Sequence, residues 1–204
     1  MRVWFVRHGE SEANVLNVFS NRGWKHPLTE LGRKQTATLA ETLSGLGVTA
    51  IYTSPVRRAV ESADILSSRL EVPYEIEPAL AEYDVGVYEG TTDPEGWKQH
   101  GEIARQWLAG NYDARMTEGE SCNEIVARLG PFISGLVKRF GPRRDAVIVL
   151  VGHGGTYNAG LPRVLSNVSY SFALSHRLSN AGYAEALLRD GKLHCVRWGD
   201  ATLE

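Results

Sequence analysis

Short apolar runs alternate along the chain with longer segments in which apolar residues recur every three to four positions. The run at residues 2–6 predicts a first strand, and the uninterrupted apolar run at residues 146–151 is typical of a central strand covered on both faces. Further strands are expected at residues 48–53, 72–76, 180–188 and 192–198. Strands separated by helices, with Asp190-Gly191 as a hairpin turn between the last two strands, indicate an α/β protein that ends in an antiparallel pair.

Start signals mark the expected helices. Thr29 is predicted to N-cap one helix, and Ser54 is predicted to N-cap another that has Pro55 at its first position. Ser121 opens a capping box at the start of a third helix, which has apolar residues along one side. Residues 77–120 are expected to hold only short helices. The predicted helices cover residues 10–16, 30–44, 55–69, 122–140 and 154–165.

Composition narrows the class of protein. The 204 residues, 43% of them hydrophobic, contain no linker or repeat, so we expect one domain over residues 1–204. The formal net charge of −2 creates no field that favours nucleic acid or an anionic membrane. We find no signal peptide and no run approaching the ~18 apolar residues of a membrane span, and we expect a cytoplasmic protein. The two cysteines, Cys122 and Cys195, form no Cys-x-x-Cys pair and fit a reducing compartment. No signal predicts the oligomeric state.

Three predicted strands end in residues that suit chemistry. These ends are Arg7-His8-Gly9, Ser54-Pro55 and Gly152-His153-Gly154. Because ligands bind at the carboxyl ends of strands in open α/β sheets, we expect the three ends to meet. Arg57 and Arg58 lie in the first turn of a helix, where a cation costs up to ~1 kcal/mol unless an anion is bound there. Either both arginines reach solvent, or one of them joins Arg7, His8 and His153 in a cationic pocket suited to a phosphoryl group.

The segment Arg7-His8-Gly9-Glu10-Ser11 resembles the signature of the histidine phosphatase superfamily, the phosphoglycerate mutase-like proteins. The resemblance continues in order down the chain, and the matching segments are Asn14, Pro27–Gly32, Ser54–Ala63, Leu80–Gly90, Gly119–Ser121 and Gly152–Gly154. It covers residues 2 to about 155. It selects Arg58 rather than Arg57, because the family arginine directly precedes an alanine, and it selects Glu82 among the many carboxylates. It also implies the family fold, a three-layer α/β/α arrangement with a mostly parallel central sheet and a C-terminal antiparallel hairpin.

The resemblance implies roles for these residues. His8 would attack phosphorus and form a phosphohistidine, with its other ring N–H held by an acceptor such as the Gly9 carbonyl. Glu82 would protonate the leaving oxygen and then take a proton from water, a role for which its pKa should be raised. The residues expected to bind the phosphate are Arg7, Asn14, Arg58, His153 and Gly154. No cofactor or metal is expected, although a rival hypothesis makes His8, Glu10, Glu82 and His153 ligands of a divalent metal.

The resemblance leaves two activities open. A mutase must keep water from the phosphohistidine, and the stretch between Glu82 and Ser121 is too short for the long lid of the family's mutases. We therefore expect hydrolysis of small phosphorylated metabolites. Phosphoglycerate mutase-type transfer is the alternative, and a catalytically silent phosphate-binding protein is a third hypothesis.

Two further groups of residues are candidates for substrate contacts. The first comprises Asn21, Arg22, Gly23 and Tyr83. Arg22, with Lys25 and His26, either favours a substrate that carries a second anionic group or lies in a solvated loop. The second group is a set of aromatic residues that either lines the leaving-group pocket or packs in the core: Tyr83, Tyr88, Trp97, Trp107 and Tyr112.

Overall fold

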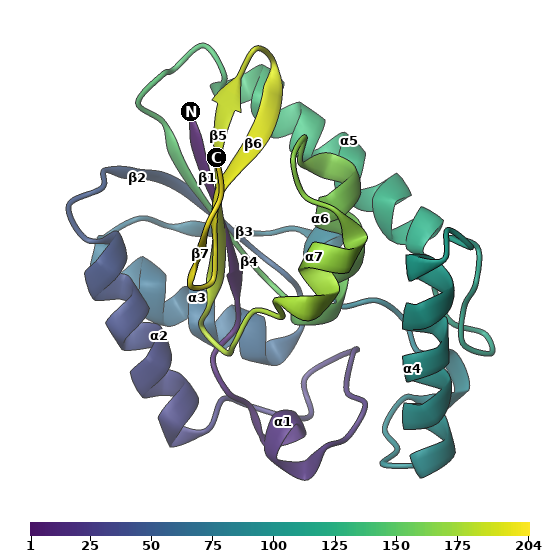
Figure 1. The fold of residues 1–204 in the computed structure, drawn as a ribbon. Coiled ribbons are helices and arrows are strands. Elements are labelled where there is room, and N and C mark those ends of the chain that lie inside the picture. Colours follow the sequence, from purple (N-terminus) through teal and green to yellow (C-terminus); the bar gives the residue numbers. More distant parts are fainter.

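A seven-stranded sheet forms the centre of the computed structural model, which describes residues 1–204 (Figure 1). The strand order is β3-β2-β4-β1-β5-β6-β7. The first four strands in this order are parallel, and the last three are antiparallel. The strands are β1 (Arg2–Arg7), β2 (Val48–Thr53), β3 (Tyr74–Ile76), β4 (Val147–Gly152), β5 (Tyr183–Arg189), β6 (Lys192–Trp198) and β7 (Ala201–Thr202). The predicted α/β class with a C-terminal antiparallel hairpin is confirmed, although the sheet is mixed, with three parallel and three antiparallel pairings.

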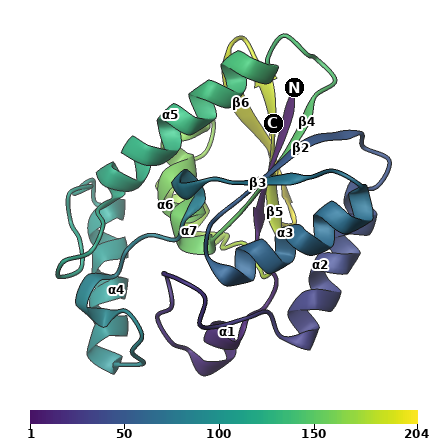
Figure 2. The same cartoon turned by 180° about the vertical axis from the view of Figure 1, so that it is seen from behind.

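Helices cover both faces of the sheet, as Figures 1 and 2 show from opposite sides. One face carries α2 (Glu30–Leu43) and α3 (Arg57–Leu70), and the other carries α5 (Cys122–Phe140), α6 (Gly154–Val164) and α7 (Tyr170–Ser175). The central strand β4 is buried along its whole length. Its odd-numbered valines pack towards α2 and α3, whereas Ile148 and Leu150 pack towards α5 and α6, because successive side chains of a strand point to opposite faces. This two-sided burial explains its uninterrupted apolar sequence.

The expectation of only short helices at residues 77–120 is wrong. Besides two short 3-10 helices, Pro78–Leu80 and Gly86–Tyr88, this stretch contains the 15-residue helix α4 (Pro94–Leu108). Asp93 caps it by accepting a hydrogen bond from the Glu95 N–H. Figure 1 shows α4 outside the two helical layers, at the end of the molecule where α1 (Glu12–Leu16) also lies. None of the helices combines the length and hydrophobicity that crossing a bilayer requires.

One of the three predicted helix N-caps is wrong. Thr29 accepts a hydrogen bond from the Gly32 N–H at the start of α2, and Ser121 forms the predicted capping box at the start of α5. Ser54, however, is not an N-cap, because α3 begins only at Arg57. Instead, the Ser54 hydroxyl accepts a hydrogen bond from the Val56 N–H, two residues further along the chain. Because α3 starts three residues after Ser54, Ser54 lies directly after β2, where it becomes part of the site described next.

Candidate active site

The three strand ends singled out in the sequence meet at one edge of the sheet. In the parallel register Arg7 lies opposite Gly152, and Thr53 lies opposite Val151. The backbone continues this register beyond the strands, since the His8 N–H donates to the Gly152 carbonyl at 3.0 Å. The rings of His8 and His153 consequently lie with their centroids 5.1 Å apart.

Arg58 lies between the two histidines. Its Nε donates to His8 Nε2 at 2.8 Å, and one of its Nη atoms lies 3.2 Å from His153 Nδ1. His8 Nδ1 lies 2.6 Å from the Gly9 carbonyl, which can only accept, so Nδ1 carries the proton. His8 Nε2 therefore presents a lone pair towards the guanidinium. This is the tautomer that a nucleophilic histidine requires.

The same reasoning assigns the proton on His153 and brings Ser54 into the site. Because the Arg58 guanidinium can only donate, His153 Nδ1 accepts and Nε2 carries the proton. His153 Nε2 then donates to the Ser54 hydroxyl at 2.7 Å. Sequence reasoning treated Ser54 as a helix cap and missed this contact. The signal available in the sequence was that Ser54 follows a predicted strand, as His8 and His153 do.

Burial keeps these histidines neutral. The exposed fractions of His8, Arg58 and His153 are 2%, 4% and 0%. Burial and the adjacent charge of Arg58 hold the pKa of His8 well below its usual value, and they lower the pKa of His153 in the same way. Burial lowers the pKa of Arg58 to about 10, which still leaves it charged at neutral pH. The pKa of Arg7 is also lowered by burial.

The remaining phosphate candidates lie around the same cavity. Arg7 donates through Nη1 to the Leu178 carbonyl at 2.7 Å, while its buried Nε has no partner in the protein. The Oδ1 atom of Asn14 accepts hydrogen bonds from Ser11 and Asn180, which leaves its amide N–H groups as donors. Gly154 also lines the cavity. The buried, unpartnered Nε of Arg7 is the kind of donor that a phosphoryl oxygen would satisfy.

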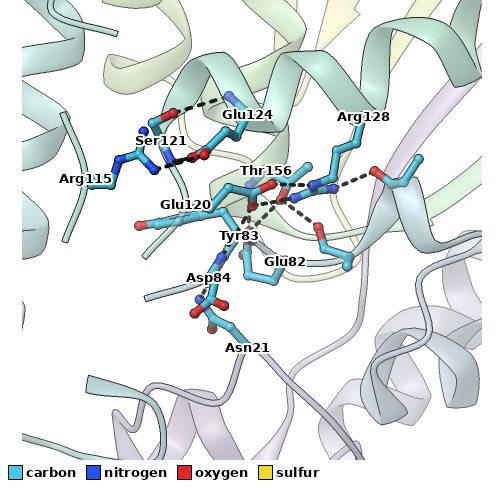
Figure 3. A network of polar contacts seen from close by, with 12 residues as sticks. Asn21, Glu82, Tyr83, Asp84, Arg115, Glu120, Ser121, Glu124, Arg128 and Thr156 are labelled. Carbon is cyan, nitrogen blue, oxygen red and sulfur yellow. Dashed lines mark hydrogen bonds and ion pairs between the residues drawn. The ribbon is translucent and has the colours of Figure 1, made fainter. Parts of the chain in front are cut away.

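Glu82 is held at the N-terminus of α6. One carboxylate oxygen accepts from the Gly155 N–H at 3.0 Å, and the other accepts from the Thr156 N–H at 2.6 Å and its hydroxyl at 3.0 Å. Figure 3 shows Arg128 on the far side of Thr156, where it donates two hydrogen bonds to Glu120. These contacts fix the carboxylate of Glu82 beside the cavity that also contains His8 and Arg58.

The candidates for substrate contacts separate into two places. Asn21 and Tyr83 line the cavity, and the Asn21 amide donates to the Tyr83 carbonyl at 2.7 Å. Arg22 and Gly23 instead line a neighbouring groove, where Arg22 pairs with Asp84. Sequence spacing carried no sign of this ion pair, which turns Arg22 away from the cavity. Nor do the other two basic residues of that loop belong to the cavity lining, since Lys25 is exposed and His26 is buried beside Glu12.

The cavity next to the two histidines has a volume of about 300 Å³. Of the aromatic candidates, Tyr83, Trp97 and Trp107 line it, whereas Tyr88 and Tyr112 do not. Sequence reasoning missed a further set of lining residues, Phe19, His100, Asn158, Tyr170 and Arg177. Arg177, Asn158 and Tyr170 lie beyond residue 155, where the family motifs end. No group of three or more His, Cys, Asp or Glu side chains is arranged to hold a metal ion, so the ligand set of the rival hypothesis is not assembled.

Comparison with known proteins places this chain in a family of enzymes. The model of the histidine phosphatase superfamily (branch 1) matches residues 3–201, and the chain belongs to this superfamily. It is 31% identical over 166 residues to the adenosylcobalamin/alpha-ribazole phosphatase of Salmonella typhimurium, a match that covers 81% of this chain and 80% of the relative. It is 31% identical over 160 residues to the 2,3-bisphosphoglycerate-dependent phosphoglycerate mutase of Bartonella quintana, which covers 76% of each chain.

A solved structure shows the same fold. The mycobacterial glucosyl-3-phosphoglycerate phosphatase in complex with VO3 superposes with a TM-score of 0.82 at 25% identity, and the match covers 98% of this chain and 99% of that one. The family predicted from the motifs is therefore confirmed. Because the relatives include both phosphatases and a mutase, the choice between these activities depends on the cavity of this chain.

Proposed function

We propose that this chain is a phosphomonoester hydrolase that acts through a phosphohistidine at His8. The observation that carries the proposal is the state of the His8 ring. Its proton is held on Nδ1 by the Gly9 carbonyl, and its Nε2 lone pair faces the guanidinium of Arg58 beside the cavity. A neutral imidazole with a free nitrogen and a fixed partner cation is suited to attack on phosphorus.

In the proposed reaction the phosphoryl oxygens accept hydrogen bonds from Arg7 and Arg58. Arg58 exchanges its bond to His8 for one to a phosphoryl oxygen, and this exchange frees Nε2. Nε2 then attacks phosphorus while the bond from phosphorus to the leaving oxygen breaks, and Glu82 donates a proton to that oxygen. Water attacks the phosphohistidine next and gives a proton to Glu82, which releases inorganic phosphate and restores His8. Asn14 and Gly154 bind the phosphoryl group throughout. His153, predicted from the sequence to bind phosphate directly, instead holds the Arg58 guanidinium in place, because its two ring nitrogens are engaged by Arg58 and Ser54.

The charge of the cavity favours hydrolysis over mutase activity. A phosphoglycerate mutase must hold a bisphosphorylated intermediate, which carries at least four negative charges. The cavity offers three arginines, Arg7, Arg58 and Arg177, to balance those charges. Part of its remaining wall is aromatic, formed by Phe19, Tyr83, Trp97, Trp107 and Tyr170. Such a wall fits an organic leaving group better than a second phosphoryl group.

The proposal is tested by steady-state turnover of p-nitrophenyl phosphate in excess EDTA, combined with rapid acid or alkaline quenching of the enzyme. We expect turnover with EDTA present, and a phosphoenzyme that is stable in alkali and labile in acid. Both should vanish in His8→Ala and persist in His194→Ala, a control on β6 outside the cavity. Turnover that survives in His8→Ala would refute the nucleophile. A phosphoenzyme that passes its phosphate to phosphoglycerates faster than to water would favour the mutase.

A further inference from the structure

We propose that the cavity selects leaving groups that combine a flat ring with a separate anionic group, and that Arg177 binds this anionic group. The proposal rests on the phosphatase function above and assigns the class of substrate. The ring would lie against the aromatic wall, while the phosphoryl group occupies the site of His8 and Arg58.

The aromatic wall offers apolar surface, and the polar ends of three of its rings are already satisfied within the protein. Trp97 Nε1 donates to the Asn17 carbonyl at 3.2 Å, and Trp107 Nε1 donates to the Ala114 carbonyl at 2.8 Å. The Tyr170 hydroxyl donates to the Ala159 carbonyl at 2.6 Å. The two indoles and the Tyr170 hydroxyl therefore have no free hydrogen to offer a ligand, whereas the Tyr83 hydroxyl forms no hydrogen bond within the protein. The faces of these rings favour a flat apolar partner.

The wall is also held in place. Phe19 stacks on Trp97 with ring centroids 3.9 Å apart, and Tyr83 packs edge-on against Trp107 at 5.6 Å. Phe19, Tyr83 and Trp107 are buried in a core cluster that joins α4 to the start of α5. A leaving group would therefore meet a preformed surface, which lowers the entropy cost of binding it.

Three polar side chains line the same cavity without partners in the protein. Arg177 is exposed to solvent and forms no hydrogen bond or ion pair, His100 forms no hydrogen bond, and the buried Oδ1 of Asn158 has no donor. Burial and then the charge of Arg177, which lines the same cavity, lower the pKa of His100 to about 4. These side chains come from α4, α6 and the segment after α7, and together they supply one cation and two neutral groups.

The charge balance indicates what Arg177 binds. The two negative charges of a phosphomonoester are matched by Arg7 and Arg58, which adjoin His8 and His153. Arg177 then remains as a cation with no acidic partner. An anionic group on the leaving group would pair with it through charge-assisted hydrogen bonds. A neutral leaving group of the same shape would leave Arg177 to solvent, so the cavity should discriminate between the two.

The test compares benzyl phosphate, 4-carboxybenzyl phosphate and the methyl ester of the latter, which have similar alcohols as leaving groups and differ in charge. We expect wild-type enzyme to prefer the carboxylate over its methyl ester by about tenfold in kcat/KM, the scale of one partly exposed charged hydrogen bond. In Arg177→Gln this ratio should fall to about one. It should stay at its wild-type value in Arg69→Gln, a matched control on the exposed end of α3. Ethyl phosphate should be a poorer substrate than benzyl phosphate, and Trp97→Leu should narrow that difference.

Three results would overturn the proposal. The first is an unchanged carboxylate preference in Arg177→Gln. The second is an equal loss of kcat/KM for all substrates in that variant, which would assign Arg177 to the phosphoryl group. The third is the absence of any preference for benzyl over ethyl phosphate. Binding of the phosphonate analogues, in which CH2 replaces the ester oxygen, is measured in parallel by calorimetry. Because binding needs no turnover, a carboxylate preference in binding without any hydrolysis would refute the phosphatase function and retain the ligand class. Hydrolysis without a carboxylate preference in either assay would refute the ligand class and retain the phosphatase function.

Discussion

Lowering the pH from 7.5 to 5.5 should destabilise this protein through the buried histidines of its candidate active site. His8 and His153 are buried next to Arg58, and the pKa of each is well below that of an unfolded histidine. His100 in the cavity wall has a pKa of about 4. In this pH window the unfolded chain binds protons at these positions and the folded protein does not. The free energy of unfolding therefore falls as the pH falls below about 6.5.

The magnitude follows from the proton count. Each histidine that stays neutral in the folded state lowers the free energy of unfolding by about 1.4 kcal/mol over this window, given an unfolded pKa of ~6.5. His8 and His153 together contribute about 2.7 kcal/mol, and His100 raises the total to about 4 kcal/mol. Since domains of this size are stable by only about 5–15 kcal/mol, the loss should be large.

Urea unfolding followed by tryptophan fluorescence measures the effect at both pH values. In His153→Gln the fall in the free energy of unfolding should shrink by about 1.4 kcal/mol, because one linked proton is removed. Leu129→Ala serves as the control, since it removes a fully buried leucine and lowers stability without removing a proton site. A fall below about 1 kcal/mol in wild type, or one of equal size in His153→Gln, would show that these histidines are not held neutral by the fold.

Three other substitutions test the site and its supports. Arg58→Lys keeps the charge but loses the planar contacts to both histidines, so kcat should fall by about 10²–10³-fold with a smaller change in KM; activity near wild type would remove Arg58 from the proposed mechanism. Gly32→Ala should cost about 1–3 kcal/mol or more in urea unfolding, because the new Cβ would lie 1.9 Å from the Glu10 carbonyl oxygen; full stability would mean that α2 can shift away from the signature loop. Ser121→Ala should cost about 1 kcal/mol by the same assay through loss of the α5 capping box, and Ser134→Ala within the same helix should not; equal effects would contradict the capping role.

Local patterns were sufficient to place two of the parallel strands. The predicted strands at residues 48–53 and 146–151 agree with β2 and β4 to within one residue. The uninterrupted apolar sequence of β4 follows from its burial along its whole length between two helical layers, whereas β2 is buried only over its last three residues. Helix α4 was missed although its sequence is about as amphipathic as that of α3. Trp97, Ile103 and Trp107 of this helix pack in one core cluster, so the signal of a longer helix was available in the sequence.

The chain's own sequence determined the family, and it pointed to the proposed nucleophile His8 and its partner Arg58, because these residues occur in short motifs at the ends of apolar strands. Only the tertiary structure decided how they meet. Arg58 contacts His8 across 50 positions and His153 across 95 positions of the chain, contacts that depend on the order β2-β4-β1 in the sheet. The partners of Ser54 and Arg22 and the convergence of His100, Asn158 and Arg177 on one cavity were likewise decided in three dimensions. The direction of a side chain and the charge nearest to it depend on which elements pack together, and the order of residues along the chain does not by itself specify that packing.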